Sequence, residues 1–241
     1  MLEVRHASKT FGGVHALDDV SFSLSAGEVV ALAGDNGAGK STLIKIIAGV
    51  HRASAGEVLF DGKPIQFANP RDARDAGIET IYQDLALAEN LDVPANIFLG
   101  REPVVYRFGL FPVIDRTAMR QASETVLRSL EIHTSLHRPV RDLSGGQRQA
   151  VAIGRAIFWN ARLLIMDEPT AALGVPEQRK VIELIHRLRE KGVGVLFISH
   201  NLGDIFAVSD RIIVLRRGIK AGERLVGETN GDEIVRLMVG G

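Results

Sequence analysis

The sequence predicts an α/β fold in which strands alternate with helices and a helical subdomain is inserted. Three observations lead to this prediction. The stretch GDNGAGKST, residues 34–42, lies between a short β-branched run and an apolar run that ends at Gly49, as expected for a strand, a glycine loop and a helix. A second apolar run, LLIM at residues 163–166, is followed by two adjacent acids. Between these segments, from Asp84 to Arg141, the pattern becomes irregular and then helical.

The composition limits the classes of function. A chain of 241 residues, 46% of them hydrophobic, can form one α/β domain or two small ones around a buried core. Basic and acidic residues both number 29, so no overall basic field favours nucleic acid, and we expect no nucleic-acid partner. The absence of cysteine excludes disulfides and thiolate metal sites. We see no apolar signal core and no run of about 18 apolar residues, so we expect neither an export signal nor a membrane span.

The segments around the glycine loop have the pattern of strands. Residues 1–33 alternate apolar and polar side chains with glycine breaks, and the run EVVALA predicts the strand that enters the loop. After the loop, Leu43–Ala48 predicts a helix that Gly49 ends. The stretch GEVLFDGKPIQF then predicts a hairpin with Asp61 and Gly62 as its turn.

The remaining elements follow from periodicity and end signals. A buried strand is expected from Ile78 to Tyr82, ending at Gln83. In the inserted segment, Asp115 is a candidate helix cap, and one helical face carries Met119, Ala122, Val126 and Leu130. The α/β pattern returns with strands expected at 163–166, 193–198 and 212–215, and with a helix from about 176 to 191 that Gly192 ends.

The glycine loop has the composition of a phosphate-binding loop. It matches G-x-x-x-x-G-K-[ST], and residues without a Cβ let successive backbone N–H groups surround an anion at a helix N-terminus. We expect Lys40 to reach the β- and γ-phosphates, Ser41 to place its hydroxyl on magnesium and Thr42 to hold the α-phosphate. A tight turn is the alternative, but it explains neither the lysine nor the hydroxyl. The expected nucleotide-binding residues are Gly34, Asp35, Asn36, Gly37, Ala38, Gly39, Lys40, Ser41 and Thr42.

The two acids after the second apolar run suit hydrolysis. They follow a strand at its carboxyl end, where ligands bind in open parallel sheets. Asp167 is placed to hold magnesium through its water shell, and Glu168 to orient and deprotonate the attacking water. A buried structural acid pair is the alternative interpretation.

A second helix start has unusual glycines. In LSGGQRQ, Ser144 and Gln147 predict a capping box before an apolar helix, so the simplest interpretation is a well-capped helix. Gly145 and Gly146 weaken that helix by roughly 0.5 to 1 kcal/mol each relative to alanine, and a cap does not require them. They leave N–H groups that could take an anion. Two helix N-termini that suit phosphate suggest that one ATP molecule is held between two protein surfaces.

Four stretches occur in a fixed order along the chain: GDNGAGKST, LSGGQRQ, LLIMDEP and FISHNL with its isolated His200. In this order they resemble the motifs of the nucleotide-binding subunit of an ABC transporter, and the resemblance covers essentially the whole chain. The resemblance implies a P-loop NTPase (ABC ATPase) core with an N-terminal antiparallel β subdomain, formed by residues 1–83 and 162–241. It also implies an α-helical subdomain, about residues 84–161, that carries the signature motif. Residues 1–241 would then make a single ABC nucleotide-binding domain.

The resemblance also implies roles in binding ATP and Mg²⁺. Gln83 resembles the loop glutamine that touches magnesium and the catalytic water and relays motion to the membrane subunit. His200 resembles the switch histidine that contacts the γ-phosphate, and Phe11 matches the aromatic residue that stacks on adenine. Each residue type is more often structural when it stands alone. Order and spacing reverse that expectation for Gln83 and His200, and do so more weakly for Phe11.

Longer stretches, such as IYQDLALAENLDVPANIFLGREP, resemble the ATP-binding proteins of bacterial monosaccharide importers of the ribose, xylose and fructose group. Many of these carry two such domains in tandem, so a single domain implies a homodimer. The implied partners are integral membrane permease subunits and, indirectly, an extracytoplasmic sugar-binding protein, with the chain peripheral on the cytoplasmic face of the bacterial cell membrane. One departure is Gly174, where the wider family usually has an aspartate that couples the two ATP sites. The sequence does not name the sugar.

Proteins of other function classes share some of these motifs. An importer ATPase for another solute, such as branched-chain amino acids, has the same motifs. A soluble ABC-type ATPase acting on DNA or ribosomes would show a long coiled coil or a tandem arrangement with a basic linker, and the sequence has neither. A non-enzymatic scaffold would be expected to lose Glu168 or His200, and both are present.

The segment from Leu85 to Pro112 is a candidate for contact with the permease. It follows Gln83, lacks regular periodicity and carries apolar and aromatic residues that we expect to be exposed, among them Phe98, Tyr106, Phe108 and Phe111. We expect it to form part of a groove for a cytoplasmic helix of the permease. Core packing within the helical subdomain is the alternative.

Overall fold

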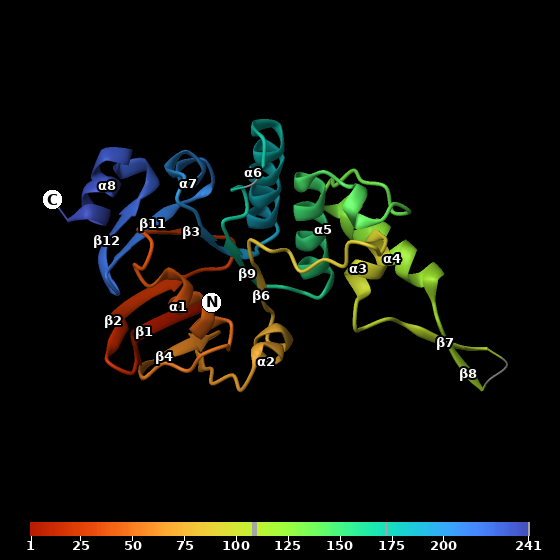
Figure 1. The fold of residues 1–241 in the computed structure, drawn as a ribbon, viewed down its shortest axis with the longest axis horizontal. Helices are drawn as coiled ribbons and strands as arrows, with labels where there is room; N and C mark the ends of the chain where they lie inside the picture. Colours follow the sequence, from red (N-terminus) through yellow and green to blue (C-terminus); the bar gives the residue numbers. More distant parts are fainter. Residues whose placement is uncertain (108–109, 172, 241) are drawn as a thin grey trace. The chain divides into compact units, whose positions relative to one another are not determined.

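A computed structural model describes residues 1–107, 110–171 and 173–240 and divides the chain into two compact units. The first unit comprises Met1–Gln83, Ala161–Ala171 and Ile185–Gly241, and the second comprises Asp84–Asn160 and Ala172–Leu184. Figure 1 labels most of the elements of both units. In the part of the chain that the structure describes, no helix is long and apolar enough to cross a membrane.

The first unit is built on a six-stranded sheet. Five of its strands are parallel, and only the edge strand β12 (Ile219–Leu225) runs antiparallel, to β11 (Arg211–Arg216). The strands β3 (Val29–Ala33) and β10 (Gly194–Ile198) are buried, as is most of β9 (Leu163–Asp167), which explains their largely apolar sequences. The sheet order is β12 (Ile219–Leu225), β11 (Arg211–Arg216), β3 (Val29–Ala33), β10 (Gly194–Ile198), β9 (Leu163–Asp167) and β6 (Ile78–Ile81).

A smaller antiparallel sheet in the same unit has the order β2 (Val14–Leu24), β1 (Leu2–Phe11), β4 (Ala55–Phe60) and β5 (Lys63–Pro64). The predicted hairpin is confirmed between β4 and β5. Its turn residues Asp61 and Gly62 have φ angles of 51° and 73°, the left-handed values that a tight two-residue hairpin turn demands.

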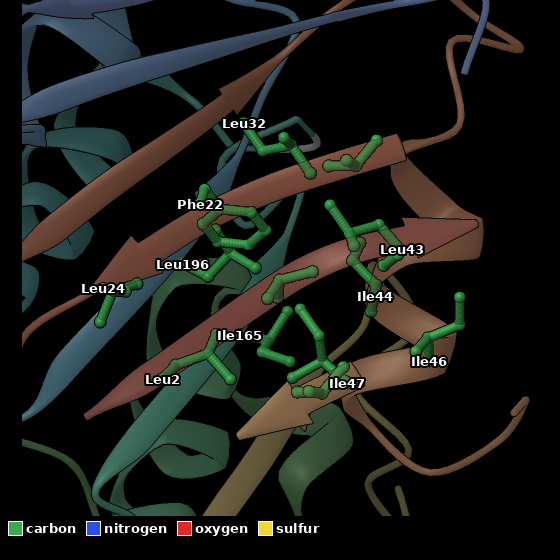
Figure 2. Packing of buried hydrophobic residues seen from close by; sticks show 14 of the residues in the cluster. Leu2, Phe22, Leu24, Leu32, Leu43, Ile44, Ile46, Ile47, Ile165 and Leu196 are labelled. Atoms are coloured by element: carbon green, nitrogen blue, oxygen red, sulfur yellow. The ribbon is translucent and has the colours of Figure 1, made fainter. Parts of the chain in front are cut away.

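The helix α1 (Lys40–Ile47) is anchored in the core that joins the two sheets. Figure 2 shows its buried side chains Leu43, Ile44 and Ile47 beside residues of both sheets, including Leu2, Phe22, Leu24, Leu32, Ile165 and Leu196. Burying one such side chain contributes roughly 1.5 to 3 kcal/mol. This anchoring fixes the glycine loop, because the loop leads directly into α1.

Several short elements of the first unit were not predicted. These are α2 (Pro70–Asp75), α7 (Leu202–Val208), α8 (Gly231–Val239), the edge strand β12 and the 3₁₀ helix Val226–Glu228. The helices α2, α7 and α8 each start after an asparagine whose side chain accepts a backbone N–H: Asn69, Asn201 and Asn230. Asparagine is a favoured cap, so these residues were the available signal.

The second unit is mainly helical and has its own apolar cluster. Its helices are α3 (Val93–Phe98), α4 (Arg116–Ser129), α5 (Gly145–Phe158), the 3₁₀ helix Val140–Asp142 and the first part of α6 (Val175–Glu190). The predicted cap of α4 is confirmed, because Asp115 accepts the Ala118 N–H at 2.9 Å. The predicted apolar face is confirmed as well, since Met119, Val126 and Leu130 are buried and Ala122 is partly buried against the same cluster.

The segment expected to be irregular contains α3 and a two-stranded hairpin of β7 (Val104–Arg107) and β8 (Phe111–Ile114). The expectation for Phe98 was wrong: it is buried and packs on Phe158 and Trp159. Tyr106 and Phe111 are 67% and 64% exposed, as expected. Phe108 lies outside the described residues.

Candidate nucleotide-binding and hydrolysis site

The glycine loop connects β3 to α1 and needs glycine for two physical reasons. Gly34 and Gly39 have φ angles of 149° and 106°, in the region that favours glycine. A Cβ on Gly34 would also lie 2.4 Å from the Leu215 carbonyl oxygen, and one on Gly39 2.8 Å from the Ala16 oxygen. The next residues begin α1, whose first N–H groups receive no side-chain cap. The loop therefore presents backbone donors at a helix N-terminus, an arrangement that suits phosphate.

Lys40 folds back over the loop. Its Nζ donates hydrogen bonds to the carbonyl oxygens of Gly34, at 2.5 Å, and Asp35, at 3.0 Å. Burial lowers the pKa of Lys40, while the charges of Glu168, Asp167 and Asp35 act in the opposite direction. The ammonium group thus lies close enough to Asp167 and Glu168 for their charges to act on it. Asp35, Asn36, Gly37 and Ser41 are exposed, Gly39, Lys40 and Thr42 are half-buried, and Gly34 and Ala38 are buried.

Asp167 ends β9 and is half-buried. Burial raises its pKa, the neighbouring Glu168 charge raises it further, and Lys40 opposes both. A carboxylate whose charge is disfavoured in this way gains from a cation. The described residues contain no group of three or more His, Cys, Asp or Glu side chains that could hold a metal ion. Asp167 and Ser41 nevertheless carry the donor types that Mg²⁺ uses, since this ion commonly takes one or two oxygen ligands from a protein together with phosphates and water.

Glu168 is held in a strained backbone conformation. Its φ angle is 52°, a left-handed value that costs a non-glycine residue on the order of 1 kcal/mol. The Glu168 N–H donates to the Ile198 carbonyl at 2.9 Å, which ties the residue to the end of β10. Its carboxylate lies 2.8 Å from Nδ1 of His200. The His200 side chain is 72% exposed and that of Glu168 only 18%, so the pair reaches from the sheet edge toward the surface.

Gln83 and Phe11 lie at two different places in the first unit. Gln83 is exposed and follows β6, beside the strand that delivers Asp167. Phe11 ends β1 and is 44% exposed, so it is not a core residue. Its ring meets the His51 ring edge-on at a centroid distance of 5.3 Å and the Lys9 ammonium at 5.0 Å.

The Ser144 helix start belongs to the second unit and forms the predicted capping box. The Gln147 N–H donates to the Ser144 hydroxyl at 3.3 Å, and the Ser144 N–H donates to the Gln147 side chain at 2.9 Å. The structure adds a packing reason for the two glycines. A Cβ on Gly145 would lie 2.6 Å from a Leu173 methyl, and one on Gly146 3.0 Å from Cγ of Glu177.

The parallel sheet explains which predicted residues come together. All of them lie at or just after carboxyl ends of parallel strands in the first unit: Asp167 ends β9, and residues 34–42, Gln83, Glu168 and His200 follow strand ends. Phe11 lies on the antiparallel sheet, and residues 144–147 belong to the second unit. Sequence reasoning missed Lys9 and His51 beside Phe11, and it missed a buried contact between Thr170 and Asp204. That contact joins residues 34 positions apart, so no local pattern could reveal it.

The chain matches the ABC transporter family over residues 17–171. It is 50% identical to the xylose/arabinose import ATP-binding protein XylG of Sulfolobus acidocaldarius, over 99% of this chain and 93% of that protein. It is 48% identical to the ribose import ATP-binding protein RbsA 1 of Rubrobacter xylanophilus, over 100% of this chain and 47% of that protein. The chain thus spans about half the length of the RbsA relatives it matches.

Solved structures show the same fold. The ADP conformation of MJ1267, an ATP-binding cassette of an ABC transporter, has a TM-score of 0.83 and 28% identity, with 100% of this chain and 99% of that one covered. The dimeric structure of MJ0796, a bacterial ABC transporter cassette, has a TM-score of 0.76 and 26% identity, with 94% and 99% covered. The predicted ABC ATPase fold, with its antiparallel β subdomain and helical subdomain, is confirmed. The chain therefore belongs to the ABC transporter family and is one of its ATP-binding proteins.

Proposed function

We propose that this ATP-binding protein is the ATP-hydrolysing subunit of an importer that carries a monosaccharide through separate membrane subunits. The similar proteins are named for the import of xylose and arabinose, ribose, and fructose. The observation that carries the hydrolytic part is the 2.8 Å contact between Glu168 and His200, at the sheet edge where Lys40 and Asp167 also lie. The identity of the sugar does not follow, because we expect the permease and an external binding protein to recognise it.

In this proposal, the glycine loop binds the phosphates of ATP. Backbone N–H groups of residues 34–42 donate to the phosphate oxygens, and Thr42 supports the α-phosphate. Lys40 exchanges its present carbonyl partners, Gly34 and Asp35, for the β- and γ-phosphates. Ser41, Asp167 and Gln83 would hold Mg²⁺, which would neutralise charge on the phosphates. Phe11 offers an exposed ring on which adenine can stack.

Glu168 and His200 act on the γ-phosphate side of the nucleotide. The Glu168 carboxylate orients a water molecule and takes its proton as the water attacks phosphorus. His200 keeps one ring nitrogen on Glu168. In the imidazolium form both ring nitrogens carry N–H groups, so the other nitrogen can donate to a γ-phosphate oxygen. The exposure of the His200 side chain permits this contact without a change in the fold.

We propose a head-to-tail homodimer as the active form. The cassette MJ0796 is described as dimeric, including a post-hydrolysis state bound to ADP and Pi, which supports this arrangement. Residues 34–42 of each chain would face Ser144–Gln147 of the partner chain and enclose two ATP molecules. Gly174 leaves the loop after Leu173 without the aspartate usual in the wider family, so coupling between the two ATP sites would not use that side chain.

The proposal places the dimer peripherally on the cytoplasmic face of the bacterial cell membrane, attached to integral permease subunits. A pull-down of the tagged chain from membranes of the source organism, scored for a polytopic permease, tests this. Recovery of a permease encoded with a sugar-binding protein supports the proposal. Recovery of ribosomes or DNA-repair proteins without a permease would contradict it, as would recovery of a permease for amino acids.

A further inference from the structure

The contact between Glu168 and His200 depends on the backbone positions of two loops, because packing does not fix the His200 side chain. This side chain is 72% exposed, so its place depends on the backbone around it. Ser199, directly before it, is buried and accepts the Asn201 N–H at 3.0 Å. Asn201 in turn caps α7 by accepting the Gly203 N–H at 2.9 Å. The position of α7 therefore sets the position of His200.

A buried hydrogen bond connects α7 to the loop that carries Glu168. The Thr170 hydroxyl donates to Oδ2 of Asp204 at 2.6 Å, and the two residues are only 1% and 6% exposed. Thr170 lies in the turn that Ala171 closes by donating its N–H to the Glu168 carbonyl at 3.3 Å. Asp204 lies in the first turn of α7, one turn after His200. The bond thus joins the turn that follows Glu168 to the helix that follows His200.

Burial of the Asp204 carboxylate costs free energy, and an apolar side chain could fill the same space. Removing a charged group from water is unfavourable unless hydrogen bonds compensate. A hydroxyl that donates to a carboxylate forms one of the stronger hydrogen bonds, with a narrow range of lengths and angles. Such a bond defines the distance between two backbones more sharply than apolar packing does.

We propose that Thr170 and Asp204 are positioning residues for hydrolysis, which hold the His200 loop at the distance from Glu168 that the reaction requires. The inference rests on the proposed function of Glu168 and His200. Neither Thr170 nor Asp204 touches the nucleotide in this account. Their loss lowers the rate of the chemical step and leaves nucleotide binding by residues 34–42 nearly unchanged.

The test measures kcat and KM for ATP in the full chain with Thr170→Val, which keeps the shape and removes the hydroxyl. We expect kcat to fall about 10- to 100-fold, the range for small misplacements of reacting groups, with KM changed less than about threefold. Thr170→Ser, which restores the hydroxyl, should return kcat to within about threefold of the wild type. A matched control is Ser209→Ala at the end of α7, because the Ser209 hydroxyl is also buried and has no hydrogen-bond partner among the described residues.

A double-mutant cycle separates positioning from general destabilisation. If Thr170 acts through His200, then His200→Ala should cost much less in the Thr170→Val chain than in the wild type. Equal costs in both chains would overturn the proposal, as would an unchanged kcat in Thr170→Val or a failure of Thr170→Ser to rescue. If Thr170→Val does not fold, Asp204→Asn, which keeps a weaker acceptor, enters the same cycle with the same criterion. Loss of activity in Glu168→Gln and His200→Ala tests the proposed function separately.

Discussion

Glu168 combines an unfavourable backbone with a favourable side-chain environment. Its left-handed φ of 52° turns the carboxylate out of the direction that β9 would give it. The Ile198 carbonyl holds its N–H, and His200 meets its carboxylate. Strain of this kind persists only where the surrounding structure enforces it, and it concentrates at functional sites. The conformation therefore agrees with the role of general base that we propose.

The first prediction concerns this side chain. Glu168→Gln keeps the size and the contact with His200 but cannot take a proton, so ATP hydrolysis should fall by roughly 10² to 10⁴. ATP and Mg²⁺ binding, measured by calorimetry, should remain. Glu190→Gln, an exposed change at the end of α6, is the matched control. Turnover close to that of the wild type in Glu168→Gln would remove Glu168 from the role.

Among the strands, β12 occupies an edge, and one arginine ties it to the rest of the sheet. Arg211 of β11 pairs with Glu223 of β12, and its Nε and Nη2 donate to Glu28 at 3.0 and 2.8 Å. Burial acts to raise the pKa of Glu223, but hydrogen bonds from Arg211 and Lys220 outweigh it, so the pKa lies below the usual value of 4.5. The folded state thus favours the charged carboxylate.

The second prediction is a pH dependence with a defined sign. Because the folded pKa of Glu223 is lowered, the stabilisation is present above pH 4.5, the ordinary Glu pKa, and is lost as the pH falls through the lowered value. Glu223→Gln should therefore lower Tm at pH 7 and make little difference in strong acid. Glu228→Gln, at an exposed position just after β12, should leave Tm unchanged at both pH values. An equal loss of Tm for Glu223→Gln at every pH would contradict this account.

The hairpin of β7 and β8 has exposed apolar side chains on both faces. Val104, Val105 and Tyr106 are consecutive and are 52%, 48% and 67% exposed. Two-stranded hairpins are marginally stable alone, and exposed apolar groups of this kind commonly mark a binding surface.

The third prediction is that single cysteines at Tyr106 or Phe111, introduced into this cysteine-free chain, cross-link to the permease in membranes. Cross-links formed only from the exposed Lys63 on β5, the matched control, would contradict the expected docking segment.

The elements that sequence reasoning found are those whose burial leaves a pattern. Uniformly apolar strands such as β3 and β10, and a helix as long as α4, show their environment directly. The helix α7 has seven residues, which is too short for a periodic pattern. The hairpin has no alternation because both faces are exposed. Phe98 was placed wrongly because its aromatic partners lie about 60 residues later, at Phe158 and Trp159.

The residues of the proposed site can be predicted from the sequence, whereas the contacts that support them cannot. The loop from Gly34 to Thr42 and the acids after β9 are local motifs with a direct chemical meaning. The tie between Thr170 and Asp204 depends on how the chain folds back on itself. So does the packing of Leu173 and Glu177 against the glycines of the Ser144 helix. Such contacts leave no trace in spacing or periodicity.

For the assembled protein, the fourth prediction concerns the dimer. ATP added to Glu168→Gln should shift the chain from monomer to dimer in light scattering, because bound ATP is not consumed and each nucleotide joins two chains. Ser144→Arg should abolish this shift and leave nucleotide binding by the monomer intact. Ser135→Arg adds the same charge at an exposed serine of the same unit and should dimerise normally. Dimerisation of Ser144→Arg would remove the Ser144 helix start from the interface.

The central claim is that the loop GDNGAGKST supports ATP hydrolysis only together with a second chain. One helix N-terminus can hold the phosphates from one side, but charge on the γ-phosphoryl oxygens in the transition state gains from donors on the other side as well. The most direct measurement is ATP turnover per chain of the isolated protein as it is diluted through its dimerisation range at saturating ATP. The account predicts that turnover per chain falls in step with the dimer fraction. A turnover per chain that stays constant well below this range would contradict it.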